Sequence, residues 1–207
     1  MADRSLLSLL RPGLRRPGLV LALLLLGPTP ATVAAQDRRA PFETLEVMVV
    51  GATNVNHNFL HTFWKPHTGG GLVLTTPFYL GTAEVGGLYH EYTPRSEGRP
   101  LFNAFFLFAG WGLHARPTAR ISWYNGFRVG NYRMSFDEDT FSGTRNESEL
   151  TFALQSRLSL SLSSRIAVHL EGGYQKTYTF LRLKLFFVSA GLSYRLHSPA
   201  WLKELLQ

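Results

Sequence analysis

The chain of 207 residues contains no cysteine, which excludes disulfide bonds, thiol catalysis and metal centres with cysteine ligands. Charged residues make up only 17% of the sequence and are scattered, without a block of lysine or arginine and without a recognisable nucleic-acid-binding module. We therefore expect no nucleic-acid partner. No apolar run reaches the roughly 20 residues that a membrane-spanning helix needs. Aromatic residues, at 13%, and 19 glycines instead favour strands and turns.

The longest apolar run covers residues 19–26, close to the N-terminus. Arginines precede it at positions 11, 15 and 16, Gly27 and Pro28 follow it, and small residues occupy positions 33–35. This arrangement predicts a secretory signal peptide over residues 1–35, cleaved before Gln36, with an uncleaved membrane anchor as the alternative. Its removal takes away four basic residues and one acidic residue, which lowers the net charge from +7 to +4.

Apolar and polar residues alternate through most of the remaining chain, most clearly over residues 148–163. One face carries Leu150, Phe152, Leu154, Leu158, Leu160 and Leu162, and the other carries Thr151, Gln155, Arg157, Ser159 and Ser161. A period of two over this length predicts a tilted membrane-crossing strand of about 9–11 residues, whereas soluble strands have about five or six. We expect eight strands, at 43–53, 70–79, 82–92, 101–114, 119–134, 148–163, 165–177 and 182–196. For the segments 70–79, 101–114 and 182–196 the sequence does not decide which side chains face the lumen, because these segments are more continuously apolar.

The expected connections alternate in length. Polar links at 54–68, 93–100, 135–147 and 177–182 are mostly long, and those at 80–81, 115–118 and 163–164 are tight. Outer-membrane barrels have long external loops and short periplasmic turns. An even strand count then puts both termini in the periplasm. We expect a periplasmic segment at 36–41, the barrel at 42–196, and a periplasmic tail at 197–207 that forms a short amphipathic helix.

The last strand contains a polar residue, a glycine, an aromatic residue and a hydrophobic residue at Ser189, Gly191, Tyr194 and Leu196. This spacing resembles the assembly signal of small eight-stranded outer-membrane barrels of the OmpA transmembrane-domain and OmpX type, which the chain resembles over residues 42–196. The resemblance implies an all-β, single eight-stranded antiparallel up-and-down transmembrane barrel in the outer membrane of a Gram-negative-type bacterium. It also implies contact with outer-membrane lipids and lipopolysaccharide, and with the barrel-assembly machinery during biogenesis. The family usually ends at this strand, whereas this chain continues.

Eight strands enclose a lumen just wide enough to be filled by side chains. The inward charges predicted from the polar faces are Glu46, Glu84, Glu171, Arg120, Arg128, Arg157 and Arg195. Because charges in a narrow lumen are costly unless they are paired, we expect a salt-bridge network that stabilises the barrel. A wide pore is excluded on this view, and a narrow ion path remains an alternative.

Three further groups of side chains are candidate sites. Histidines of the first long loop could bind a transition metal (His57, His61, His67), and acidic residues near the third could attract Ca²⁺ (Asp137, Glu138, Asp139, Glu147, Glu149). Nothing in the sequence orders the first loop, and the acidic group lacks the ligand spacing of an EF-hand, so we expect solvated loops and no metal site. Cations near the outer strand ends could meet lipid phosphates (Arg133, Lys176, Arg182, Lys184).

The sequence therefore predicts a structural or surface-interaction barrel with no catalytic residue, cofactor or metal. One alternative is a lipid-modifying enzyme of the lipid A deacylase or acyltransferase type. His90 is the candidate base for it, but the deacylase pattern has a serine two residues later, where this chain has Tyr92. Another alternative is a soluble periplasmic lipid carrier, which would turn its apolar face inward.

Overall fold

The computed structural model describes residues 41–137, 146–179 and 182–199. The signal peptide expected at 1–35 and the helix expected in the tail lie outside these residues. The strands are β1 (Thr44–Asn54), β2 (Trp64–Pro66), β3 (Gly69–Phe78), β4 (Gly81–Pro94), β5 (Phe102–Ala115), β6 (Ile121–Phe136), β7 (Asn146–Ser161), β8 (Ile166–Thr177) and β9 (Leu183–His197). One short helix, α3 (Phe59–Phe63), lies between β1 and β2.

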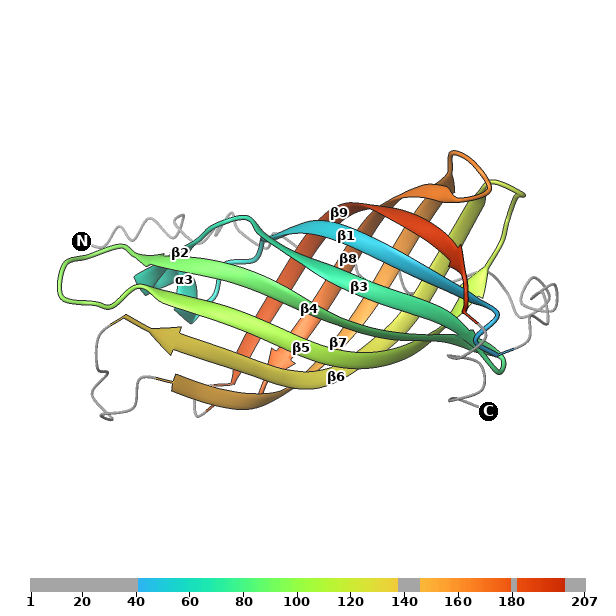
Figure 1. Ribbon diagram of the computed structural model, residues 1–207. Coiled ribbons are helices and arrows are strands. Elements are labelled where there is room, and N and C mark those ends of the chain that lie inside the picture. Colours follow the sequence, from blue (N-terminus) through green and yellow to red (C-terminus); the bar gives the residue numbers. More distant parts are fainter. Residues whose placement is uncertain (1–40, 138–145, 180–181, 200–207) are drawn as a thin grey trace, which may run out of the picture.

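The strands close into a ring in which every neighbour is antiparallel. The order β4-β3-β1-β9-β8-β7-β6-β5 returns to β4 through the β4–β5 pairing (Figure 1). The short β2 pairs with the far end of β4 beyond β3, so β2 and β3 occupy the same position in the ring. The prediction of an eight-stranded antiparallel barrel is therefore confirmed. None of the described residues forms a helix that is both long and apolar enough to cross a membrane.

Two of the tight turns are held by hydroxyl side chains. Thr118 Oγ1 accepts hydrogen bonds from the amides of Arg120 (3.3 Å) and Ile121 (3.0 Å) before β6 begins. Ser163 Oγ accepts from the amides of Arg165 (3.2 Å) and Ile166 (3.0 Å) before β8 begins. Such local bonds favour turns over continued strands. These turns lie at the same end of the barrel as the start of β1 and the end of β9, and the long connections lie at the other (Figure 1).

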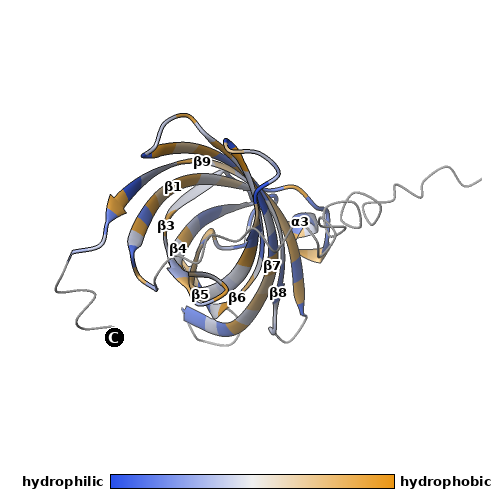
Figure 2. Cartoon of the chain, turned by 90° about the vertical axis from the view of Figure 1, so that its right-hand side faces the viewer, coloured by the Kyte–Doolittle hydropathy of each residue, from blue (hydrophilic) through white to orange (hydrophobic). Residues whose placement is uncertain are grey.

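Apolar and polar residues alternate along the strands, as the banding in Figure 2 shows, and the buried and exposed positions alternate in the same way. The exposed apolar face of β7 is the one predicted from residues 148–163, and Gln155 and Arg157 are buried in the lumen. The structure also shows which side chains point inward on β3, β5 and β9, where the sequence left this undecided. Val73, Phe106 and Leu185 point inward, and exposed outward side chains on the same strands include Leu72, Leu107 and Leu192.

The interior is polar only in part. From its middle to the tight-turn end the lumen holds charged and hydroxyl side chains. Its loop half is packed mainly with apolar ones, beside the hydrogen-bonded Thr151, Gln175 and Thr177. Members of this apolar layer include Met48, Leu60, Val73, Leu88, Tyr92, Phe102, Phe106, Tyr132, Met134, Leu185 and Phe187. The expected filling of the lumen by charged side chains therefore does not extend to the loop half. The physical reason is that inward aromatic rings on the adjacent strands β4, β5 and β6 pack against one another.

Candidate functional site

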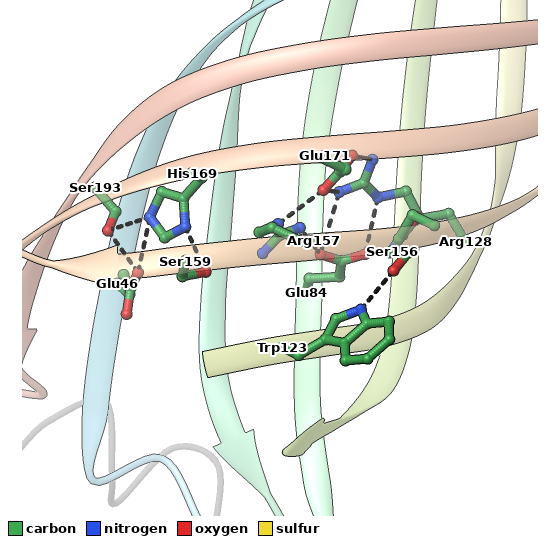
Figure 3. Close-up of polar contacts among 11 residues, drawn as sticks. Glu46, Glu84, Trp123, Arg128, Ser156, Arg157, Ser159, His169, Glu171 and Ser193 are labelled. Carbon is green, nitrogen blue, oxygen red and sulfur yellow. Dashed lines mark hydrogen bonds and ion pairs between the residues drawn. The ribbon is translucent and has the colours of Figure 1, made fainter. Parts of the chain in front are cut away.

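Four charged side chains from four strands form a closed cluster at the middle of the lumen (Figure 3). Arg128 on β6 bonds both oxygens of Glu84 on β4, with Nε to Oε1 at 2.8 Å, and both oxygens of Glu171 on β8, with Nη1 to Oε1 at 2.8 Å. Arg157 on β7 bonds the same two carboxylates, with Nε 2.7 Å from Glu171 Oε2 and Nη2 2.9 Å from Glu84 Oε2. Two positive and two negative charges therefore cancel.

These charges are almost completely removed from solvent. The side chains of both arginines are 5% exposed, that of Glu84 is 0% exposed and that of Glu171 is 11% exposed. Gln155 donates a further hydrogen bond to Glu84. Isolated buried charges would cost several kcal/mol each, and pairing with charge-assisted hydrogen bonds offsets that cost.

The register of the sheet explains why these residues meet. Arg157 lies directly opposite Glu171 in the β7–β8 pair. Glu84 and Arg128 stand in one row on either side of Gly110, which pairs with both. A Cβ atom at position 110 would lie 2.9 Å from Glu84 Oε1 and 2.5 Å from the Phe127 carbonyl oxygen. Gly110 thus leaves the gap through which Glu84 and Arg128 bond across β5.

Aromatic rings pack against both guanidinium groups. The Arg128 guanidinium carbon lies 4.4 Å from the centre of the Phe108 ring, and that of Arg157 lies 4.9 Å from the Tyr124 ring. Such contacts contribute about 0.5–2 kcal/mol, more when desolvated. On the loop side of the cluster, Tyr92 stacks on Phe102 at 4.6 Å, and both are essentially fully buried. An ionic layer and an aromatic layer therefore close the lumen in series.

A second polar cluster lies nearer the tight-turn end. Ser193 Oγ donates to Glu46 Oε1 at 2.5 Å, and Arg195 Nη2 donates to Glu46 Oε2 at 3.0 Å. The two nitrogens of His169 contact Ser193 Oγ (2.6 Å, Nε2) and Ser159 Oγ (2.8 Å, Nδ1). Because Ser193 donates its proton to Glu46, its oxygen accepts from Nε2 of His169, which also lies 3.5 Å from Glu46 Oε1.

A hydroxyl bonded to an imidazole also occurs at nucleophilic active sites, so this cluster needs weighing as a catalytic centre. It lines a polar cavity of about 100 Å³ that ends at Arg157. Pockets for small-molecule ligands are usually about 300–1,000 Å³. Ser159 is only 6% exposed and its hydroxyl faces the ring of His169. We interpret the cluster as a hydrogen-bonded element of the barrel wall.

The structure places the seven predicted lumen charges unequally. Glu84, Arg128, Arg157 and Glu171 form the central cluster, and Glu46 and Arg195 form a separate pair. Arg120 was expected in the lumen, and this is wrong. It is exposed and lies in the turn before β6, because the turn that Thr118 stabilises reaches as far as Ile121, where the strand begins. Sequence reasoning did not single out Gly110, Gln155 or His169 as members of these clusters.

The four residues of the expected assembly signal all lie on β9. Ser189 is buried on the lumen side, and Gly191 lies on the same face. Tyr194 and Leu196 lie on the outer face and are exposed. Their role in assembly stays a prediction.

The first long loop is ordered, contrary to expectation. Asn58 caps α3: its side chain accepts from the Leu60 amide at 2.9 Å, and its own amide approaches Nδ1 of His61 at 3.3 Å. Arg95 of the second loop donates through Nε to the His61 carbonyl at 2.9 Å. Trp64 Nε1 donates to the Pro100 carbonyl at 2.9 Å. We call this joined structure of residues 56–66 and 94–101 the loop cap.

His61 is buried within the loop cap, and its Nε2 atom has no hydrogen-bond partner among the described residues. Burial, together with the nearby charges of His57 and Arg95, holds the pKa of His61 below its ordinary value of 6.5. No group of three potential ligands suited to a metal ion occurs among the described residues.

His90 does not have the surroundings of a catalytic base. Its ring lies in the lumen 4.7 Å from the ring of Phe187, and its Nδ1 has no hydrogen-bond partner in the described part of the chain. Strand alternation turns Glu91 to the opposite face. The lipid-hydrolase alternative therefore gains no support from this position.

Comparison with known proteins shows the fold. No protein-family model matches the chain, and no curated protein matches it. Among solved structures, Neisserial surface protein A is similar at 10% identity with a TM-score of 0.50, over 74% of this chain and 96% of that one. The fold is that of the small outer-membrane β-barrels. Two further structures are similar. The N-terminal barrel domain of Pseudomonas aeruginosa OprF has 12% identity and a TM-score of 0.48, over 76% of this chain and 100% of that one. Ail, the attachment invasion locus protein of Yersinia pestis, has 15% identity and a TM-score of 0.45, over 74% of this chain and 97% of that one.

Proposed function

We propose that this protein is an integral barrel of the bacterial outer membrane with a sealed lumen, and that it acts through its surfaces as a structural or surface-interaction protein. The observation that carries the proposal is the series of two layers that fill the lumen. The central four charges are mutually paired and nearly unexposed, and the rings of the aromatic layer beyond them are almost completely buried. We infer from these two layers that a solute does not pass through the barrel.

The outer surface supports a membrane location over the soluble-carrier alternative. Large apolar side chains cover the outside of the strands, among them Val49, Leu72, Leu107, Leu154 and Leu192, each more than half exposed. Soluble monomers rarely expose contiguous apolar patches of more than a few hundred Å². In lipid, polar groups on this face need partners, and Trp123 Nε1 accordingly donates to Ser156 Oγ at 2.7 Å.

Cell fractionation tests the location. The protein is expected in outer membranes after carbonate and high-salt washes, with both termini periplasmic and the loop cap accessible to protease added to intact cells. Release into the soluble periplasmic fraction would instead support the lipid-carrier alternative.

Conductance tests the seal. Purified wild-type protein in a planar bilayer is expected to give no steady current, because the ionic and aromatic layers close the lumen in series. A steady ohmic current whose ion selectivity changes in Arg157→Gln would support the narrow-pore alternative. The matched control is Arg120→Gln, which removes an exposed arginine outside the lumen.

The surface that this proposal assigns to an interaction is the loop cap. Its two loops are joined by Arg95 and Trp64, and the guanidinium of Arg99 lies 3.9 Å from the centre of the Phe63 ring. A preformed surface loses less conformational entropy on binding than a flexible loop does.

A further inference from the structure

Three cations lie together on the outside of the barrel where β8 and β9 reach the loop end. Lys176 and Lys184 are directly opposite each other in the β8–β9 pair, and alternation turns both away from the lumen. Arg182 precedes β9, is exposed, and has a φ of 50°, a left-handed conformation that is unfavourable for a residue with a side chain.

No carboxylate of the described residues forms an ion pair with any of the three. Lys176 Nζ instead lies 4.9 Å from the centre of the Tyr178 ring. Like charges directly opposite each other on a sheet are destabilising. The buried cations of the central lumen cluster all have carboxylate partners, whereas these three outward-facing cations have none among the described residues.

The three cations line a groove that also has apolar walls. Asn58, Phe59 and Leu183 complete its lining, and its volume is about 420 Å³. Phe59 is 58% exposed and lies 4.8 Å from the Phe63 ring, which supports it. Asn58 Nδ2 donates to the Lys184 carbonyl at 2.6 Å and so fixes α3 against β9. The groove is thus bounded by two parts of the chain that are bonded to each other.

We propose that this groove binds a lipid-borne phosphate, with the phosphate against Lys176, Arg182 and Lys184 and an acyl chain along Phe59 and Leu183. The combination of cations with apolar walls at the edge of the apolar belt fits the junction between a lipid headgroup and its chain. Guanidinium and ammonium groups bind phosphate through charge-assisted hydrogen bonds. The inference rests on the proposed membrane location. Arg133, the fourth cation expected to meet lipid phosphates, lies away from the groove on β6 and donates to Asn146 at 3.3 Å.

The test measures binding of purified, folded barrel in detergent to lipid A, to dephosphorylated lipid A, to phosphatidylglycerol and to inorganic phosphate. Each variant is first checked for a gel mobility that changes on boiling, which shows that the barrel is closed. Removal of one cation near a membrane surface is expected to weaken binding about fivefold. Arg182→Gln and Lys184→Gln should each show this loss for phosphorylated lipid, and Lys184→Arg should restore most of it.

The control is Arg133→Gln, which removes an outward-facing cation from the same end of the barrel without touching the groove. Its affinity for phosphorylated lipid is expected to equal that of the wild type. Equal losses in Arg133→Gln and Lys184→Gln, equal binding of dephosphorylated lipid, or equal binding of inorganic phosphate alone would each overturn the proposal. A difference between lipid A and phosphatidylglycerol identifies the source of the phosphate. Fractionation tests the location separately, because this assay does not depend on where the cell places the protein.

Discussion

Replacing Glu171 with glutamine is expected to unbalance the charge cluster inside the barrel. Glu171 accepts hydrogen bonds at 2.8, 3.1 and 2.7 Å from the two arginines, and without its charge Arg128 and Arg157 share only Glu84. Breaking a buried pair by removing one partner costs about 3–5 kcal/mol. The side chain of Glu171 is 11% exposed and that of Arg157 is 5% exposed, so the cost should be nearer the lower limit for Glu171→Gln and higher for Arg157→Gln.

The double variant distinguishes a paired cluster from two independent polar residues. Glu171→Gln leaves the cluster with an excess positive charge and Arg157→Gln with an excess negative charge, whereas the two together restore neutrality. The double change should therefore cost less than the sum of the single changes, by about 1–3 kcal/mol.

The measurement is the free energy of unfolding in urea of barrels folded into lipid vesicles, followed by tryptophan fluorescence. Arg120→Gln is the control, because this arginine is exposed in a turn, and its effect should stay within about 0.5 kcal/mol. The reasoning is refuted if both single changes have effects as small as the control, or if the single effects are large but simply add.

Two further outcomes follow from the structure. Gly110→Ala should destabilise the barrel by about 1–3 kcal/mol, because the new Cβ would crowd Glu84, whereas Gly173→Ala in the same unfolding assay should cost less, since the nearest atom to its Cβ would be 3.7 Å away. The loop cap should become less stable as the pH falls below about 6.5. The pKa of His61 is lower in the folded cap than in the unfolded one, so protonation favours the unfolded cap. Amide hydrogen exchange of residues 59–66, corrected for intrinsic rates, should therefore accelerate in acid, and a pH-independent rate would contradict this.

The outer face was predictable from the sequence because the environment on that side is uniform. Every position that faces lipid favours an apolar residue, so a strand with a polar inner face shows a period of two, as residues 148–163 do. This signal is lost where the inner face is apolar as well. Strand β5 places Phe106 and Phe108 inside and Leu107 outside, and no hydropathy pattern distinguishes them.

The central cluster was predictable only in part. The Arg157–Glu171 pair follows from counting back from the tight turn between β7 and β8, because a short hairpin fixes its own register. The contacts of Arg128 with Glu84 and Glu171 depend on how the whole ring closes and on the missing side chain at Gly110, which no local pattern reports. The prediction that Arg120 faces the lumen was wrong for a local reason: this residue lies in the turn, where the alternation of inward and outward side chains does not hold.

The order of the layers explains why the proposed seal of the lumen needs both of them. Paired charges alone leave polar atoms that could be hydrated one after another, which is how ions cross a narrow polar constriction. In the aromatic layer beyond the cluster, Phe102 and Phe106 carry no polar atom, and the hydroxyls of Tyr92 and Tyr132 contact each other at 3.5 Å. The cluster itself carries no net charge to attract an ion. The proposed function therefore places interactions on the outer wall and the loop cap, and Lys176, Arg182 and Lys184 lie beside Phe59, where the wall and the cap meet.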